Sequence, residues 1–204
     1  MTSPIKLLLC AVMIMTFTAM TAYADVITVT GSTQGNFNGG TTSINPTLGN
    51  LLTALEFQGQ AFSTPVTTGL PAVQVQVGAF DLRTFRAFNF NGDIFNLVVT
   101  FTAPPGAPGG PQTFTANLSG IITVLQGSES ITIDFNNTPQ VFGYNGGFFT
   151  FSVNDIPSLN EQSAFVGLTA NISATEAPEP LSMLLLGSGL AGLAVKLRKR
   201  RSSE

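Results

Sequence analysis

Apolar and polar residues alternate with a period of two through the middle of the chain, and this pattern predicts β-strands. The clearest runs are Val73–Val77, Ile131–Phe135 and Phe149–Val153, in which apolar side chains face one way and Gln, Thr, Ser or Asp the other. Runs rich in Val, Ile, Thr and Phe extend the prediction to Val26–Thr30, Leu51–Phe62, Arg83–Phe90, Ile94–Thr102, Gln112–Leu118, Ile121–Leu125, Val141–Tyr144 and Phe165–Ser173.

Turn-forming residues separate these runs. Asn91-Gly92 and Asn145–Gly147 mark tight turns between apolar segments. The proline-rich segment Ala103–Pro111 predicts a long hairpin connection, because proline cannot donate to a strand ladder. The segment Gly31–Asn50, rich in Gly, Thr, Ser and Asn, predicts a long surface loop or an irregular strand pair. Short strands separated by turns favour an antiparallel arrangement.

The predicted fold is all-β: an antiparallel, jelly-roll-like β-sandwich over residues 25–170. Each strand has one apolar face, and two sheets that bury these faces against each other give a stable core. A parallel β-helix is the alternative, but the chain shows no repeat of fixed length that would support it.

The N-terminal segment predicts a secretory signal peptide over residues 1–24. A single cation, Lys6, precedes the uncharged stretch Leu7–Tyr23, and the small residues Ala22 and Ala24 place cleavage after Ala24. The one cysteine of the chain lies inside this segment, so the exported chain would contain no disulfide. Its stability would therefore depend on the core of the sandwich.

The predicted domain is acidic and carries few charges. Residues 25–176 contain nine Asp and Glu residues against two Arg, and no Lys. Binding to nucleic acid requires clustered Lys and Arg side chains that contact phosphates. The sequence therefore excludes nucleic acid as a partner.

The residue types that remain allow little chemistry. The chain has no histidine, which excludes Ser-His-Asp and Cys-His catalysis and imidazole-bound zinc. A pair of carboxylates can hydrolyse glycosidic bonds, but Asp81, Asp93, Asp134 and Asp155 stand in no shared sequence context. Asp81 and Arg83 share a strand face and predict a surface ion pair. We expect no enzyme activity and no cofactor.

One short segment is a candidate calcium site. Asn89, Asn91 and Asp93 bring three oxygen-bearing side chains around the turn residue Gly92, and calcium prefers such ligands. The spacing does not match the EF-hand loop, and an Asn-Gly hairpin turn explains the same residues without a metal. Both interpretations remain open from the sequence.

The C-terminal segment predicts a membrane helix followed by a basic tail. Leu181–Val195 is uncharged, and the basic residues that follow are Lys196, Arg198, Lys199, Arg200 and Arg201. A helix over 181–197 is short for a bilayer, so Lys196 would extend its side chain to the interface. The positive-inside rule keeps the tail 198–204 in the cytoplasm and residues 25–170 outside, with 171–180 as a linker.

The motif Pro178-Glu179-Pro180, the apolar segment and the basic cluster together resemble the PEP-CTERM sorting signal of exported bacterial proteins. The resemblance implies that an exosortase, a membrane-embedded cysteine transpeptidase, recognises Pro178, Glu179 and Pro180 and cleaves nearby. The two prolines keep this peptide extended. An ordinary single-pass anchor with a chance Pro-Glu-Pro is the alternative.

The signal peptide and the missing catalytic residues predict an exported, non-enzymatic protein, and the resemblance implies that it belongs to the cell envelope or to an exopolysaccharide or biofilm matrix. Its expected partners are the general secretion machinery, an exosortase, the inner membrane before processing, and exopolysaccharide. Three alternatives remain open: a carbohydrate-binding module, which would expose a row of Phe or Tyr144 beside Asn and Gln; a surface protein that keeps its membrane anchor; and a carboxylate hydrolase, which would need two acids facing each other in a cleft.

Overall fold

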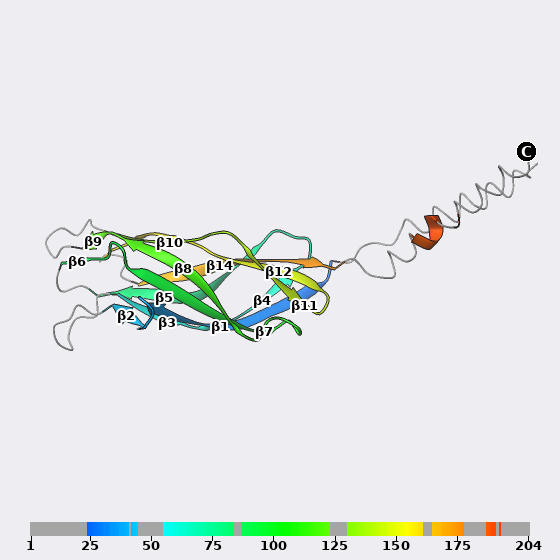
Figure 1. The fold of residues 1–204 in the computed structure, drawn as a ribbon, viewed down its shortest axis with the longest axis horizontal. Helices are drawn as coiled ribbons and strands as arrows, with labels where there is room; N and C mark the ends of the chain where they lie inside the picture. The colour runs from blue at the N-terminus through cyan, green and yellow to red at the C-terminus, as the bar shows by residue number, and fades with distance from the viewer. Residues whose placement is uncertain are drawn as a thin grey trace, which may run out of the picture.

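The computed structural model describes residues 24–40, 42–44, 55–83, 87–122, 130–160, 165–177, 187–190 and 192. Within these ranges the protein is almost entirely antiparallel β structure, arranged as two six-stranded sheets and one two-stranded sheet (Figure 1). The prediction of an all-β antiparallel fold is confirmed.

The first sheet has the strand order β13-β10-β8-β7-β1-β4. Strands β7, β8 and β10 lie side by side, and β1 connects them to the edge strand β4. The bounds are β1 Val26–Phe37, β4 Ala61–Thr67, β7 Ile94–Ala103, β8 Pro111–Ser119, β10 Ile131–Phe135 and β13 Ile156–Leu159.

The second sheet has the strand order β11-β12-β14-β5-β3-β2. Its bounds are β2 Ser43–Ile44, β3 Leu55–Gly59, β5 Val73–Leu82, β11 Gln140–Tyr144, β12 Gly147–Val153 and β14 Phe165–Glu176. The short strands β6 Phe88–Asn89 and β9 Ile121–Ile122 form the two-stranded sheet at one end of the molecule (Figure 1).

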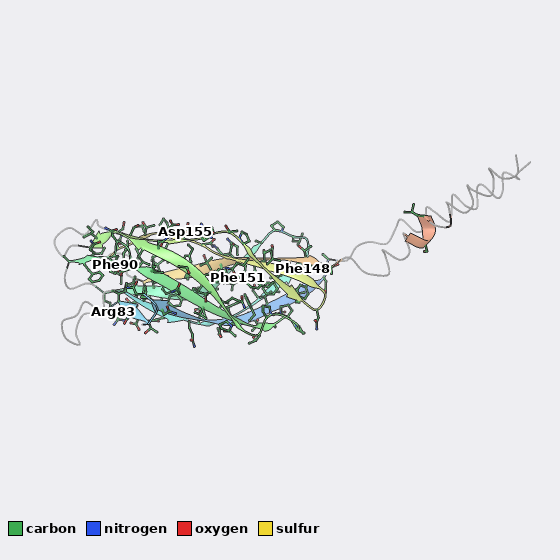
Figure 2. The ribbon with its side chains drawn as sticks, in the orientation of Figure 1. Arg83, Phe90, Phe148, Phe151 and Asp155 are labelled. Carbon is green, nitrogen blue, oxygen red and sulfur yellow. The ribbon has the colours of Figure 1, made fainter. Side chains whose placement is uncertain are left out.

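Phenylalanine rings fill the space between the two large sheets. Phe101 of β7 lies with its ring centroid 5.0 Å from those of Phe142 and Phe149, which belong to β11 and β12. At the other end of the interface, the Phe95 ring is 4.9 Å from both Phe57 and Phe80. These contacts join the first sheet to the second, so the sheets pack face to face as a sandwich (Figure 2).

The predicted strand pattern is largely confirmed. All three of the clearest alternating runs are strands, and Ala103–Pro111 connects β7 to β8, which pair with Thr100 opposite Pro111. The jelly-roll comparison is too specific, because a jelly roll has eight strands whereas two sheets of six are found here, with β7, β8 and β10 adjacent in one sheet.

The predicted strand Leu51–Phe62 is wrong in its described part, because the chain changes sheets at Gln60. β3 ends at Gly59 in the second sheet and β4 begins at Ala61 in the first. The buried side chains shift parity at this point, from Leu55 and Phe57 to Phe62. The backbone N–H of Gln60 donates to the hydroxyl of buried Thr33 at 3.1 Å. This N–H therefore has a hydrogen-bond partner where the chain passes from one sheet to the other.

The prediction of a surface loop or an irregular strand pair over Gly31–Asn50 is also wrong at its start, because β1 continues as a regular strand to Phe37. The inward positions here carry Gly31, Thr33 and Gly35, so the apolar alternation disappears from the sequence. A Cβ on Gly35 would lie 2.4 Å from Phe57 and 2.6 Å from Phe95. The facing rings occupy the volume that a side chain on β1 would otherwise fill.

The predicted linker from residue 171 is wrong as well, because β14 continues to Glu176. Asn171 to Glu176 pair with Gly147 to Ser152 of β12, so the domain ends at the sorting motif itself. Of the predicted membrane helix 181–197, the structure describes residues 187–190 and 192, which are helical. Among the described residues, no helix is both long and apolar enough to cross a membrane.

Candidate functional site

The first and last residues of the sandwich domain meet at one end of the molecule. β1 begins and β14 ends at the same end, opposite β6 and β9 (Figure 1). The backbone N–H of Asp25 points at two acceptors, Thr68 Oγ1 and Glu176 Oε1, each 2.9 Å from the nitrogen. We call Asp25, Thr68 and Glu176 the terminal junction.

Thr68 connects the two ends. It directly follows β4 and is buried, and its backbone N–H donates to the carbonyl of Asp25 at 2.8 Å. Its hydroxyl donates to Glu176 Oε1 at 2.6 Å, and the residue forms a parallel bridge with Ala174 of β14. Since the next N–H, that of Gly69, donates to the carbonyl of Ala174, this segment holds β1 and β14 together.

The last residues before the sorting motif are also hydrogen-bonded to β12 and the turn that precedes it. Glu176 pairs with Gly147, and the N–H of Ala177 donates to the carbonyl of Gly146 at 2.9 Å. Gly147 must be glycine, because a Cβ there would lie 2.1 Å from the carbonyl oxygen of Thr175. The fold therefore fixes the chain up to Ala177.

The charges of the terminal junction are negative. The pKa of Glu176 is lowered, first by the hydrogen bond from the Thr68 hydroxyl and then by that from the Asp25 backbone N–H. The pKa of Tyr144 on β11 is raised, mainly by burial and further by the carboxylates of Asp25 and Glu176. Arg83, the one cationic side chain in the described ranges, lies at the opposite end (Figure 2).

The segment that leaves this junction matches a family model. The model of the PEP-CTERM protein-sorting motif matches residues 176–201. The chain carries a PEP-CTERM sorting motif. Such a motif implies an exported protein that is sorted through the membrane and processed by an exosortase. No curated protein and no solved structure matches the chain.

The PEP-CTERM match and the fold share their boundary. The match begins at Glu176, which is the last residue of β14 and a member of the terminal junction. The recognition residues Pro178, Glu179 and Pro180 and the whole basic cluster from Lys196 to Arg201 lie outside the described residues. Of the predicted cleavage residues, Ala22 also lies outside them, and Ala24 is described and exposed.

The candidate calcium ligands each receive a hydrogen bond from a different group. Asn89 Oδ1 accepts from the N–H of Asn91 at 2.9 Å, and Asn91 Oδ1 accepts from the N–H of Gly120 at 2.8 Å. Asp93 Oδ1 accepts from the side-chain amide of Asn38 at 2.9 Å. These bonds shape the Phe90–Asp93 turn and tie it to neighbouring loops, which is the role of a structural turn.

Three of the four acidic residues considered for catalysis, Asp81, Asp93 and Asp155, have separate structural partners, and Asp134 is exposed on β10. Asp155 accepts from the N–H of Phe135 and from the amide of Asn137, both at 2.8 Å, and so fixes the end of β10. Asp81 forms the predicted ion pair with Arg83. This pair lies on the surface, where the Arg83 side chain is 60% exposed.

The outer face of the second sheet is lined by amides and hydroxyls. Gln74 and Asn154 both donate to the hydroxyl of Thr169, at 3.1 Å and 2.9 Å, and Asn171 donates to Asn154 Oδ1 at 2.7 Å. Two exposed phenylalanines flank this face. Phe148 pairs with Thr175 near the C-terminal end of β14, and Phe165 is the first residue of β14. Along β14, Thr175 is ten residues from Phe165, or about 33 Å of strand, so the two rings do not form the aromatic row expected of a carbohydrate-binding module.

Only one end of the domain was visible in the sequence. Asp25 follows the predicted cleavage point, whereas the predicted domain ended at residue 170, short of Glu176, and the contact between the two ends was missed. Nothing in the sequence indicated that Thr68 connects the two ends, because a threonine after a strand is common in any β protein. Its role depends on which strands lie beside it.

Proposed function

We propose that the chain is an exported, non-enzymatic protein of the cell envelope or extracellular matrix, from which an exosortase removes the C-terminal tail. One observation carries the proposal: the PEP-CTERM match begins at Glu176, where β14 ends, so the motif follows a folded domain directly. An enzyme that recognises an extended peptide needs a peptide outside the strands of the domain, and the end of β14 at Glu176, before Pro178, supports this arrangement.

The non-enzymatic part of the proposal is supported by the chemistry of the domain. The chain has no histidine, and its single cysteine lies before residue 25. Asp81, Asp93 and Asp155 are each engaged by a donor on a neighbouring segment. Asp155 accepts from a backbone N–H, and Asp81 and Asp93 accept from side chains, so each carboxylate stabilises its own local structure.

A contact with exopolysaccharide is the second candidate function. It is favoured by the outer face of the second sheet, where Gln74, Asn154 and Asn171 lie in one hydrogen-bonded strip and Phe148 stands exposed near its end. Amides, hydroxyls and an aromatic ring are the groups that bind sugars. Affinity electrophoresis in the host's own polysaccharide should show reduced retardation for Phe148→Ala and for Phe165→Ala, whereas Ile94→Ala, at an exposed position of the first sheet, should leave it unchanged.

The experiment that tests sorting is an intact-mass comparison of the protein from its native host, with and without the exosortase, after membrane and medium are separated. We expect the mass to end near Pro178–Pro180 only when the enzyme is present. A chain that keeps its basic tail in the inner membrane of both strains would show that the segment is an ordinary anchor.

A matched pair of variants sharpens this comparison. Replacing Pro178 and Pro180 by Ala should block processing in the enzyme-containing strain, because it removes the recognition residues and the extended backbone. Pro139→Ala, in an exposed loop between β10 and β11, should be processed normally. Equal processing of both variants would contradict the assignment of the motif as the recognition element.

A further inference from the structure

The nitrogen of Asp25 has two acceptors, which a peptide N–H must share in a three-centre hydrogen bond. Thr68 Oγ1 and Glu176 Oε1 both lie 2.9 Å from it, and one of these acceptors belongs to a carboxylate. A backbone amide carries a single hydrogen, whereas a terminal ammonium carries three and a positive charge. The geometry around this atom suits an ammonium better than an amide.

We propose that hydrolysis of the Ala24–Asp25 bond creates an α-ammonium on Asp25 that pairs with the Glu176 carboxylate and thereby fastens the end of β14 beside the sorting motif. The reaction consumes one water and leaves a carboxylate on Ala24 and an ammonium on Asp25. The inference rests on the proposed function, because it requires an exported chain whose signal peptide is removed at this bond.

The charges around the nitrogen favour this pairing. The titratable groups at the junction are the side chain of Asp25 itself, Glu176 on β14 and Tyr144 on β11, whereas the segment after β4 contributes the hydroxyl of Thr68. Before hydrolysis the two carboxylates have no cation beside them within the described residues, since Arg83 lies at the far end. The new ammonium would supply that missing charge.

The pairing has a definite pH dependence. A carboxylate beside an ammonium stabilises the charged form and raises its pKa above the ordinary value of about 7.7–8.0. A raised pKa in the folded state means that the stabilisation is fully present below about pH 7.7, down to the acid range in which Glu176 protonates, and is lost as the pH rises through the folded pKa. Salt should weaken the pair, because it is close to the surface.

The test compares two chains in detergent, residues 25–204 and residues 24–204, each released from an N-terminal fusion so that the native residue comes first. The pKa of the α-amine is measured from the pH dependence of its acylation rate, followed by mass spectrometry of the N-terminal peptide. The chain that begins at Asp25 should have a raised pKa, and Glu176→Gln should return it toward the ordinary value. The chain that begins at Ala24 should show an ordinary pKa that Glu176→Gln leaves unchanged.

Equal α-amine pKa values in the two chains, or no response to Glu176→Gln, would overturn the inference. Thr68→Ser, which keeps a hydroxyl, should retain the raised pKa and serves as the conservative control. N-terminal sequencing of the protein from its host gives the second half of the test, because a first residue other than Asp25 would also overturn it. Processing at Pro178–Pro180 is scored separately, so failure here leaves the sorting proposal standing.

Discussion

The interface between the two sheets and the terminal junction hold the same domain together by opposite means. The interface is a continuous apolar core in which residues such as Phe95, Phe101 and Phe151 are buried completely or nearly so. The junction consists of a few hydrogen bonds among Asp25, Thr68 and Glu176 at one exposed end. Apolar burial is insensitive to pH, whereas the junction contains groups whose charge can change.

The two regions therefore have different roles: the interface determines the stability of the domain, and the junction determines where the domain ends. Burying a phenylalanine contributes several times the net free energy of one hydrogen bond, so the interface determines whether the domain folds. The junction contributes less to folding, but it fixes where the folded chain ends and the sorting motif begins. A protein can therefore alter the junction by processing without risking the fold.

The largest effect is expected for Phe101→Ala. The Phe101 ring contacts Phe142, Phe149 and Phe151 across the interface, and its removal should cost about 3–5 kcal/mol in the free energy of unfolding. Denaturant unfolding followed by far-UV circular dichroism measures the loss. The exposed Phe148→Ala should stay within about 0.5 kcal/mol of the parent. Similar losses for both variants would show that the interface is not the main source of stability.

The second largest effect is expected for Gly147→Ala, because Gly147 pairs with Glu176 of the terminal junction. The added Cβ would meet the Thr175 carbonyl at 2.1 Å, and overpacking of this kind costs about 1–3 kcal/mol. Gly143→Ala, on the paired strand β11, has its nearest neighbour at 3.9 Å and should be tolerated. Hydrogen exchange at Ala177 should accelerate in Gly147→Ala only, and acceleration in both would contradict the packing argument.

A smaller effect is expected for Thr68→Val, which keeps the shape of the side chain and removes its hydroxyl. The Asp25 N–H loses an acceptor and Glu176 Oε1 loses a donor, so we expect a loss of about 1 kcal/mol. Thermal unfolding measures it, with the neighbouring Thr67→Val on the outer face of the first sheet as the control. A Thr68→Val chain as stable as the control would show that the junction contributes nothing to folding.

The smallest effect is expected from the acid titration of Glu176. Its pKa in the folded protein is below the ordinary value of 4.5, so its contribution is present above pH 4.5 and is lost as the pH falls through the lowered value. The unfolding temperature of Glu176→Gln should therefore fall less than that of the parent as the pH is lowered through this window. Identical acid profiles would argue against the hydrogen bonds that Thr68 and Asp25 make to this carboxylate.

The alternation of side chains was enough to predict the strands that carry their own apolar positions. In Val73–Val77 and Phe149–Val153 every second residue is large and apolar, so the residue types alone show which face of the strand points inward. The sorting motif was equally visible, because Pro178-Glu179-Pro180 and the basic cluster act as a linear segment. A linear signal needs no partner strand to be recognised.

Other features depended on residues that are distant in sequence. Gly35 belongs to a buried strand because Phe57 and Phe95 fill the space in front of it, and the chain changes sheets at Gln60 because Thr33 accepts its N–H. Nothing local distinguishes this glycine or this glutamine from residues of a loop.

The sequence by itself determined that the domain is all-β, that it contains no histidine or lysine, and that a sorting motif follows it. Only the tertiary structure decided that Asp25 and Glu176 meet, with Thr68 between them. Strand periodicity specifies which face of a strand is buried but not which strands become neighbours. The junction joins three segments separated by 43 and 108 residues, and such contacts exist only after the sheets have assembled.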